Sequence, residues 1–174
     1  AEVLVPPSVV FEGGGDFLKR AQLGQWGDFE KIDLTSRRGE IVGLAGLRGS
    51  GRTEIMKAIA GIDPPDEGLI EFKDRKMAFA TPDQALSVGI SYLPDERERE
   101  GLLKGFSIRD NNTLNCLREI SANGIIREKV RRSLTESLFQ AAECKAFSID
   151  QDVVELSGGN KQKVLIGRIM ALMP

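Results

Sequence analysis

Residues 46–54, GLRGSGRTE, have the residue types and the spacing of a loop that binds phosphate. Such loops carry Gly, four further residues, Gly, and then Lys followed by Ser or Thr. Gly46 and Gly51 have this spacing, and Thr53 stands where a hydroxyl can reach Mg²⁺, but Arg52 replaces the usual Lys. Arginine keeps the positive charge in a larger, planar group. We therefore expect phosphate binding to survive, and the effect of Arg52 on hydrolysis stays open.

The sequence on either side predicts the strand and helix that position such a loop. Residues 40–46, EIVGLAG, are an apolar run typical of a strand buried on both faces of a parallel sheet. A helix is expected from Arg52 to about Gly61, and its N-terminus adds free N–H groups and a favourable dipole for an anion. The candidate nucleotide-binding residues here are Gly46, Arg48, Gly49, Ser50, Gly51, Arg52, Thr53 and Glu54.

A second candidate anion site lies at residues 156–163, LSGGNKQK. Ser157 is the expected cap of a helix with Leu165, Ile169 and Leu172 on one face, and the glycines that follow Ser157 leave backbone N–H groups uncovered. Ser-Gly-Gly is common in loops, so the motif is weak alone. It becomes strong because it follows the first loop by about a hundred residues.

Between and around the motifs, the sequence predicts an α/β portion followed by a helical portion. Strands are expected at residues 8–11, 29–36, 69–73 and 90–94. A helix is expected over residues 81–89, with Thr81 as N-cap, Pro82 first, Gln84 closing a capping box and Gly89 at its end.

After Pro94 the sequence changes character. Residues 95–100, DERERE, are a charge run that is typical of a solvated face. Apolar residues then recur every four positions at Ile126, Val130, Leu134 and Leu138, which predicts an amphipathic helix over residues 125–142 with this stripe facing the core.

Composition narrows the possible classes of protein. The 174 residues carry 24 basic and 26 acidic side chains, and a net charge of −2 argues against nucleic-acid binding through bulk positive charge. The absence of histidine excludes histidine bases, histidine metal ligands and serine–histidine triads from this chain. Cys116 and Cys144 fit no metal or redox spacing, which predicts reduced thiols in a cytosolic protein. No apolar run approaches the ~18 residues of a membrane span, and the first residues do not form a signal peptide.

The two motifs together resemble the nucleotide-binding domain of an ATP-binding cassette (ABC) protein. Residues 37–61, 81–103 and 156–174 are similar to the second cassette of the tandem-cassette proteins that energise bacterial ribose, galactose or xylose importers. In that subgroup the second Walker A loop carries Arg-Thr, as here, and an acidic residue replaces the glutamine of the Gln-loop, a position that falls on Asp95. The resemblance runs from about Phe29 to Pro174.

This resemblance implies an α/β P-loop NTPase fold with a helical subdomain, and ATP with Mg²⁺ at Thr53 as cofactors. It implies a nucleotide-binding core at residues 29–95 and a Gln-loop-like segment with the helical subdomain at 96–174, after an N-terminal segment, 1–28, of uncertain structure. In the family the signature contacts the γ-phosphate of ATP held by a partner cassette. The signature residues are Leu156, Ser157, Gly158, Gly159, Asn160, Lys161 and Gln162.

The resemblance also implies partners and a location. The partners are a second cassette, transmembrane permease subunits and, indirectly, a periplasmic or extracellular sugar-binding protein, with no nucleic acid. The location is cytoplasmic, peripheral on the inner face of the cell membrane. An aromatic side chain stacks on adenine in the family, and Trp26 is the positional candidate, while a Trp packed beside the sheet is an equal alternative.

Walker B, the catalytic glutamate and the switch histidine would follow Pro174, so the chain resembles a C-terminally truncated transport ATPase domain with no identifiable catalytic residue. Phosphoryl transfer needs metal, water and charge placed together, so we expect little hydrolysis from this chain alone. The alternative is a non-hydrolytic module for nucleotide-dependent dimerisation or docking, which Arg52 and Asp95 favour. A DNA-repair ABC ATPase is disfavoured because no heptads separate the motifs, and a P-loop kinase or GTPase would not need LSGG.

Overall fold

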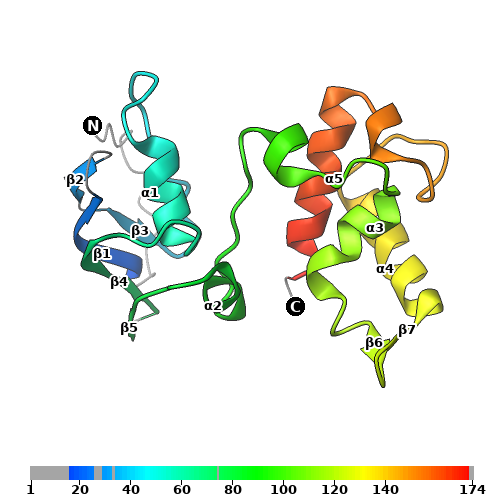
Figure 1. Cartoon of the computed structure of the whole chain (residues 1–174), viewed down its shortest axis with the longest axis horizontal. Coiled ribbons are helices and arrows are strands. Elements are labelled where there is room, and N and C mark those ends of the chain that lie inside the picture. Colours follow the sequence, from blue (N-terminus) through cyan, green and yellow to red (C-terminus); the bar gives the residue numbers. More distant parts are fainter. Residues whose placement is uncertain (1–15, 26–28, 33, 74, 173–174) are drawn as a thin grey trace. The chain divides into compact units, whose positions relative to one another are not determined.

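A computed structural model of the chain describes residues 16–25, 29–32, 34–73 and 75–172 (Figure 1). The chain divides into two units, the first ending at Tyr92 and the second beginning at Leu93. Each unit has a buried hydrophobic cluster of its own. The strand expected at residues 8–11 and the candidate Trp26 lie outside the described residues.

The first unit contains an antiparallel sheet built on one long strand. This strand, β1 (Asp16–Gln25), pairs with β2 (Phe29–Ile32), β3 (Thr35–Arg37) and β4 (Glu67–Phe72), and β4 pairs with β5 (Arg75–Met77). β3 pairs with the beginning of β1, and β2 pairs with its end. The strand expected at 69–73 is confirmed as β4, and the one expected at 29–36 is divided into β2 and β3.

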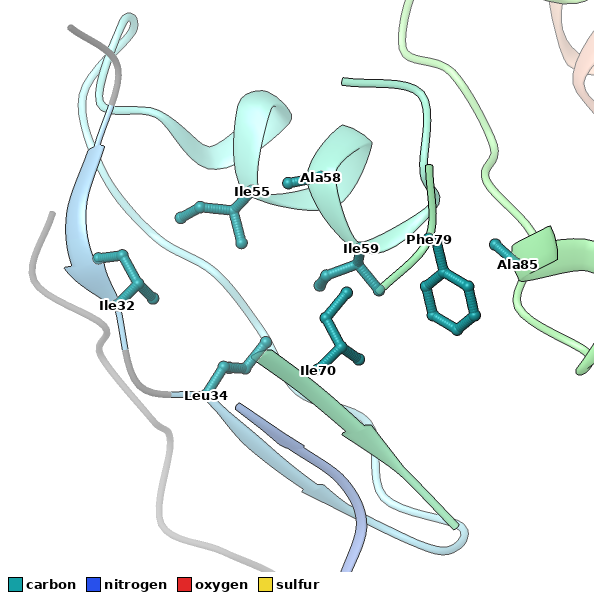
Figure 2. Close-up of a cluster of buried hydrophobic side chains, with 8 residues drawn as sticks. All are labelled: Ile32, Leu34, Ile55, Ala58, Ile59, Ile70, Phe79 and Ala85. Carbon is teal, nitrogen blue, oxygen red and sulfur yellow. The ribbon is translucent and has the colours of Figure 1, made fainter. Parts of the chain in front are cut away.

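Two helices complete the first unit, α1 (Arg52–Ile59) and α2 (Pro82–Ser87). Figure 2 shows the buried apolar side chains of this unit, which come from strands, helices and the segments between them: Ile32, Leu34, Ile55, Ala58, Ile59, Ile70, Phe79 and Ala85. Fully burying an aliphatic side chain of this size contributes about 1.5–3 kcal/mol. This core therefore fixes α1, and with it the glycine loop at the start of α1.

The second unit is mainly helical. Its elements are η1, a π-helix (Arg97–Gly101), α3 (Ile108–Thr113), η2 (Leu114–Cys116), the short strand pair β6 (Ser121–Ala122) and β7 (Ile125–Ile126), α4 (Glu128–Ala141), η3 (Val153–Glu155) and α5 (Gly158–Met170). The helix α5 contacts α3, α4 and η1. Its Val164 and Leu165 belong to a core with Leu102, Ile108, Cys144, Val153 and Leu156.

Two of the expected strands are wrong. Residues 40–46 and 90–94 lie in no strand. Val42 and Leu44 are partly buried and pack against the core of the first unit, whereas Ile41 is 93% exposed, so only one face of the first run meets the core. A strand forms only through hydrogen bonds to a neighbour, and none of the strands described here pairs with either segment.

The expected helices form, with corrections at their ends and faces. α2 begins at Pro82, but Thr81 makes no side-chain cap, and Gln84 Oε1 accepts a hydrogen bond from Ala80 N instead of closing a capping box. α4 begins at Glu128, because Ile125 and Ile126 form β7. The expected core stripe of α4 is wrong in part, because Leu138 is buried but Val130 is exposed.

On α4 the buried residues are Arg131, Thr135 and Leu138, while Val130 is 42% exposed. Arg131 can be buried because its guanidinium donates to Thr113 Oγ1 at 3.0 Å and pairs with Asp110. A buried charge needs such partners. The face of α4 that meets the core is therefore set by polar contacts as well as by apolar spacing.

Candidate functional site

The glycine loop ends where α1 begins. Ser50 N donates to Leu47 O at 3.1 Å, and Ile55 N donates to Gly51 O at 2.9 Å, which makes Gly51 the N-cap of α1. Gly49 and Gly51 have φ of +80° and +83°. This left-handed region costs an L-residue about 1–2 kcal/mol. The backbone of the loop therefore requires glycine at both positions.

A polar atom inside the loop lacks a partner. Ser50 Oγ is buried and has no hydrogen-bond partner among the described residues. A Cβ on Gly46 would collide with that same oxygen. Leaving a buried hydroxyl unpaired costs about 1–3 kcal/mol, and a ligand oxygen held in the loop would remove this cost. The loop thus fits a small oxyanion such as a phosphate.

The first turn of α1 supplies the remaining candidate groups. Arg52, Thr53 and Glu54 are partly exposed there, and Arg48 is exposed in the loop. The first N–H groups of a helix have no intrahelical acceptors and point toward the N-terminus, where the dipole favours an anion. The structure therefore brings the described candidate nucleotide-binding residues into one loop and the adjoining turn, while the candidate Trp26 lies outside the described residues.

The second motif starts α5, as the sequence predicted. Leu156 is buried in the core of the second unit. Ser157 occupies the N-cap position as expected, but its side chain makes no cap hydrogen bond to the helix backbone. Ser157 Oγ accepts a hydrogen bond from Asn160 Nδ2 at 3.1 Å, and Lys145 N donates to Asn160 Oδ1 at 3.0 Å. These contacts fix the loop before α5. Gly158 and Gly159, the first two residues of the helix, are exposed.

The next two signature side chains are turned toward their own chain. Lys161 Nζ lies 2.8 Å from Glu98 Oε1, and Arg97 Nη1 donates to Gln162 Oε1 at 3.2 Å. The hydrogen bond and charge of Lys161 hold the pKa of Glu98 below its ordinary value. The expectation of a uniformly solvated face is therefore wrong for Arg97, which is partly buried, whereas Glu98 stays exposed while it pairs with Lys161. Their alternation with other charges in the sequence gave no signal that they would reach α5.

Asp95, the candidate at the Gln-loop position, is exposed and lies in the second unit. Its carbonyl oxygen accepts a hydrogen bond from Arg97 N at 3.0 Å, directly before η1. The segment that carries Asp95 therefore leads straight into the residues that contact α5.

Arg168, near the other end of α5, was not singled out by the sequence. Its guanidinium donates to Asn111 O at 2.7 Å, Asn111 Oδ1 at 2.8 Å and Gly101 O at 2.6 Å. Burial lowers the pKa of Arg168 below its ordinary value. Arg168 thus connects α5 to α3 and to the end of η1.

The start of α3 is stabilised in the same region. Ser107 and Asp110 form a capping box, and Asp110 also pairs with Arg131 of α4. Burial alone would raise the pKa of Asp110, but hydrogen bonds from Ser107 and Arg131 outweigh burial and lower this pKa.

Cys116 and Cys144 are free and buried, and burial raises the pKa of both thiols.

A family model described as ABC transporter matches residues 29–174. The chain belongs to the ABC transporter family. The expected P-loop fold is confirmed by its similarity to solved structures of ABC proteins. Their sequence identity to this chain is so low that the comparison shows the fold and nothing more. A post-hydrolysis dimer of the ATP-binding cassette MJ0796 bound to ADP and Pi matches with a TM-score of 0.73 and 21% identity, covering 91% of this chain and 71% of that one. The protein cbiO1 from Clostridium perfringens, described as part of the ABC transporter complex cbiONQ, matches with a TM-score of 0.71 and 18% identity, covering 92% of this chain and 63% of that one.

Relatives named for ribose import share more of the sequence. Ribose import ATP-binding protein RbsA 2 of Rubrobacter xylanophilus is 39% identical over 163 residues, which is 94% of this chain and 31% of the relative. Ribose import ATP-binding protein RbsA of Geobacillus kaustophilus is 38% identical over 161 residues, or 92% and 33%. The chain spans about a third of the length of these relatives. Within the described residues, no helix combines the length and the apolar character that crossing a bilayer requires.

Proposed function

We propose that the chain is an ATP-binding cassette of an importer for a monosaccharide of the ribose type. It binds ATP at residues 46–54 and offers its signature, residues 156–162, to the site of a second cassette. One observation supports the binding site most directly: in a glycine loop at the N-terminus of α1, the buried Ser50 Oγ has no hydrogen-bond partner in the part of the chain that the structure describes. The relatives named for ribose import support the choice of transported substrate.

Each residue of the loop has a physical role in this proposal. Backbone N–H groups of the loop and of the first turn of α1 hold the phosphates, and Ser50 Oγ bonds to a phosphate oxygen. Arg52 supplies the charge that Lys supplies elsewhere, and Thr53 holds Mg²⁺ by its hydroxyl. Bound Mg²⁺ neutralises charge on the phosphates. In the same proposal Trp26 stacks on adenine, and Asp95 takes the place of the Gln-loop glutamine.

The proposed partners follow from the family. A second cassette completes the nucleotide site with its own signature, and transmembrane permease subunits hold the pair at the inner face of the cell membrane. A sugar-binding protein outside the membrane delivers the sugar to the permease.

A second function is favoured by two residues. Arg52 replaces Lys in the phosphate loop, and Asp95 is acidic at a glutamine position. Arg52 keeps the positive charge but places it on a larger, planar group, and Asp95 adds a negative charge where the family has a neutral glutamine. The chain would then bind ATP to drive dimerisation or docking, and the partner cassette would carry out hydrolysis.

Calorimetric titration of the chain with ATP, with and without Mg²⁺, tests the binding site. We expect saturable binding that Arg52→Ala weakens about tenfold, or about 1.4 kcal/mol. Arg38→Ala, which removes an exposed arginine outside the loop, is the matched control and should bind as the wild type does. A folded chain that takes up no ATP would refute the proposal. Sugar transport by the full protein separates the two functions, because Arg52→Ala should abolish transport if this site must hydrolyse ATP and leave it unchanged if it need not.

A further inference from the structure

The π-helix η1 lies along one face of the signature helix α5. Its Arg97 and Glu98 contact Gln162 and Lys161, in the first turns of α5. A Cβ on Gly101, the last residue of η1, would stand 2.8 Å from Leu165 Cδ1. Further along α5, Arg168 donates to Gly101 O. Gln162, Leu165 and Arg168 recur at intervals of three, which places them on one helical face, and Lys161 lies at the edge of that face.

Arg97 covers the beginning of this face. Its Nη1 donates to Gln162 Oε1 at 3.2 Å, and its Nη2 would lie 3.4 Å from a Cβ placed on Gly158. A cation beside a helix N-terminus is opposed by the helix dipole. The favourable contacts with Gln162 and the glycine at 158 must therefore keep Arg97 in place. A side chain at 158 would compete with the guanidinium for this space.

We propose that Arg97 is a positioning residue for the signature motif. It fixes the first turn of α5 to the segment that follows Asp95, so that a displacement of this segment moves residues 157–159. Its relevance to ATP rests on the proposed function. The contacts that carry it lie within the second unit and do not depend on that function.

The same π-helix contains a matched control. Arg99 pairs with Glu96 at 3.4 Å, and the two side chains are 80% and 62% exposed. Arg99→Ala removes the same charge and the same side-chain length from η1 as Arg97→Ala. It leaves the contacts of Arg97 and Glu98 with α5 in place.

Amide hydrogen exchange of the ligand-free chain, measured by NMR, tests the proposal. Lys161 N donates to Ser157 O at 2.9 Å, so its amide reports opening of the first turn of α5. We expect Arg97→Ala to raise exchange at Lys161 and Gln162 about tenfold, and to change it less than about twofold at Leu165. Arg99→Ala should change none of the three by more than about twofold.

Two further variants separate positioning from general loss of stability. Arg97→Lys keeps a donor for Gln162 Oε1 and is expected to restore most of the protection. Gln162→Ala should raise exchange at Lys161 as Arg97→Ala does, and the double variant should exchange no faster than either single variant, because both remove one contact. Additive effects would show that the two residues act independently and would overturn the proposal.

The remaining outcomes are also decisive. Unchanged exchange at Lys161 in Arg97→Ala, or equal acceleration at Leu165, overturns the positioning role. ATP affinity measured on the same variant should match the wild type, because Arg97 lies outside residues 46–54. A wild-type chain that binds no ATP would refute the proposed function, while the exchange result would still decide the role of Arg97.

Discussion

Replacing Arg168 by Met should destabilise the second unit by removing the hydrogen bonds that join α5 to α3 and η1. Arg168 donates to Asn111 O, Asn111 Oδ1 and Gly101 O at 2.6–2.8 Å. Met has a similar length and can keep the apolar packing of the stem, but it has no donor. The acceptors on Asn111 and Gly101 would lose this partner.

The magnitude follows from opposing contributions. A hydrogen bond from a charged donor contributes about 1.5–3 kcal/mol, so three bonds give an upper range of about 4.5–9 kcal/mol. Removing the guanidinium also removes the desolvation cost that lowers the pKa of Arg168, and Asn111 Oδ1 keeps a bond from Leu103 N at 2.9 Å. We therefore expect a loss of about 3 kcal/mol, a large part of the ~5–15 kcal/mol by which domains are stable.

Urea unfolding followed by far-ultraviolet circular dichroism measures this loss, since the second unit is mainly helical. Arg132→Met on α4 is the matched control. Arg132 is 53% exposed and pairs with Glu136 and Asp150, and such surface pairs contribute about 0–1 kcal/mol. If Arg168→Met lost no more stability than this control at an unchanged m-value, the reasoning about the three hydrogen bonds would be refuted.

Three other expectations concern further variants and can be measured by calorimetry and by urea unfolding. Gly51→Ala should cost about 1–2 kcal/mol and weaken ATP binding by calorimetry, whereas Gly39→Ala, with a similar φ of +78°, should cost stability alone. Leu156→Ala should lower the free energy of unfolding by about 2–5 kcal/mol in urea, because Leu156 is buried in the core. Asp110, whose folded pKa is lowered, stabilises the fold above its unfolded pKa near 3.8 and loses this effect as the pH falls through the folded pKa. The difference in stability between wild type and Asp110→Asn should therefore shrink on acidification below about pH 5, and a constant difference would contradict this.

The helices that carry the two motifs could be predicted because their start signals are local. Gly51 and Ser157 each precede an apolar helical pattern, and α1 and α5 begin directly after them. Capping side chains were less predictable. Thr81 and Gln84 had capping-box spacing without forming the box, whereas Ser107 and Asp110 formed one. A cap forms only where the surrounding chain leaves both side chains in reach.

The strands could be predicted less well because pairing partners decide them. The apolar run at residues 40–46 has the composition of a buried strand but pairs with none of the strands described here. Residues 16–25 mix polar and apolar types and still form β1, which pairs with β2, β3 and β4. Strand formation depends on such non-local contacts more than on intrinsic preference.

The candidate site shows the same difference between local and non-local information. The family resemblance of the motif LSGGNKQK implied that Lys161 and Gln162 belong to the signature. In the structure Lys161 pairs with Glu98, and Gln162 accepts a hydrogen bond from Arg97. A phosphate at the start of α5 would thus meet Ser157 and the backbone N–H groups of the two glycines that follow it. In the proposed function the neighbouring polar side chains would act on that phosphate through the orientation that η1 gives the helix, so their substitutions should alter the geometry of the signature and leave its N–H donors present.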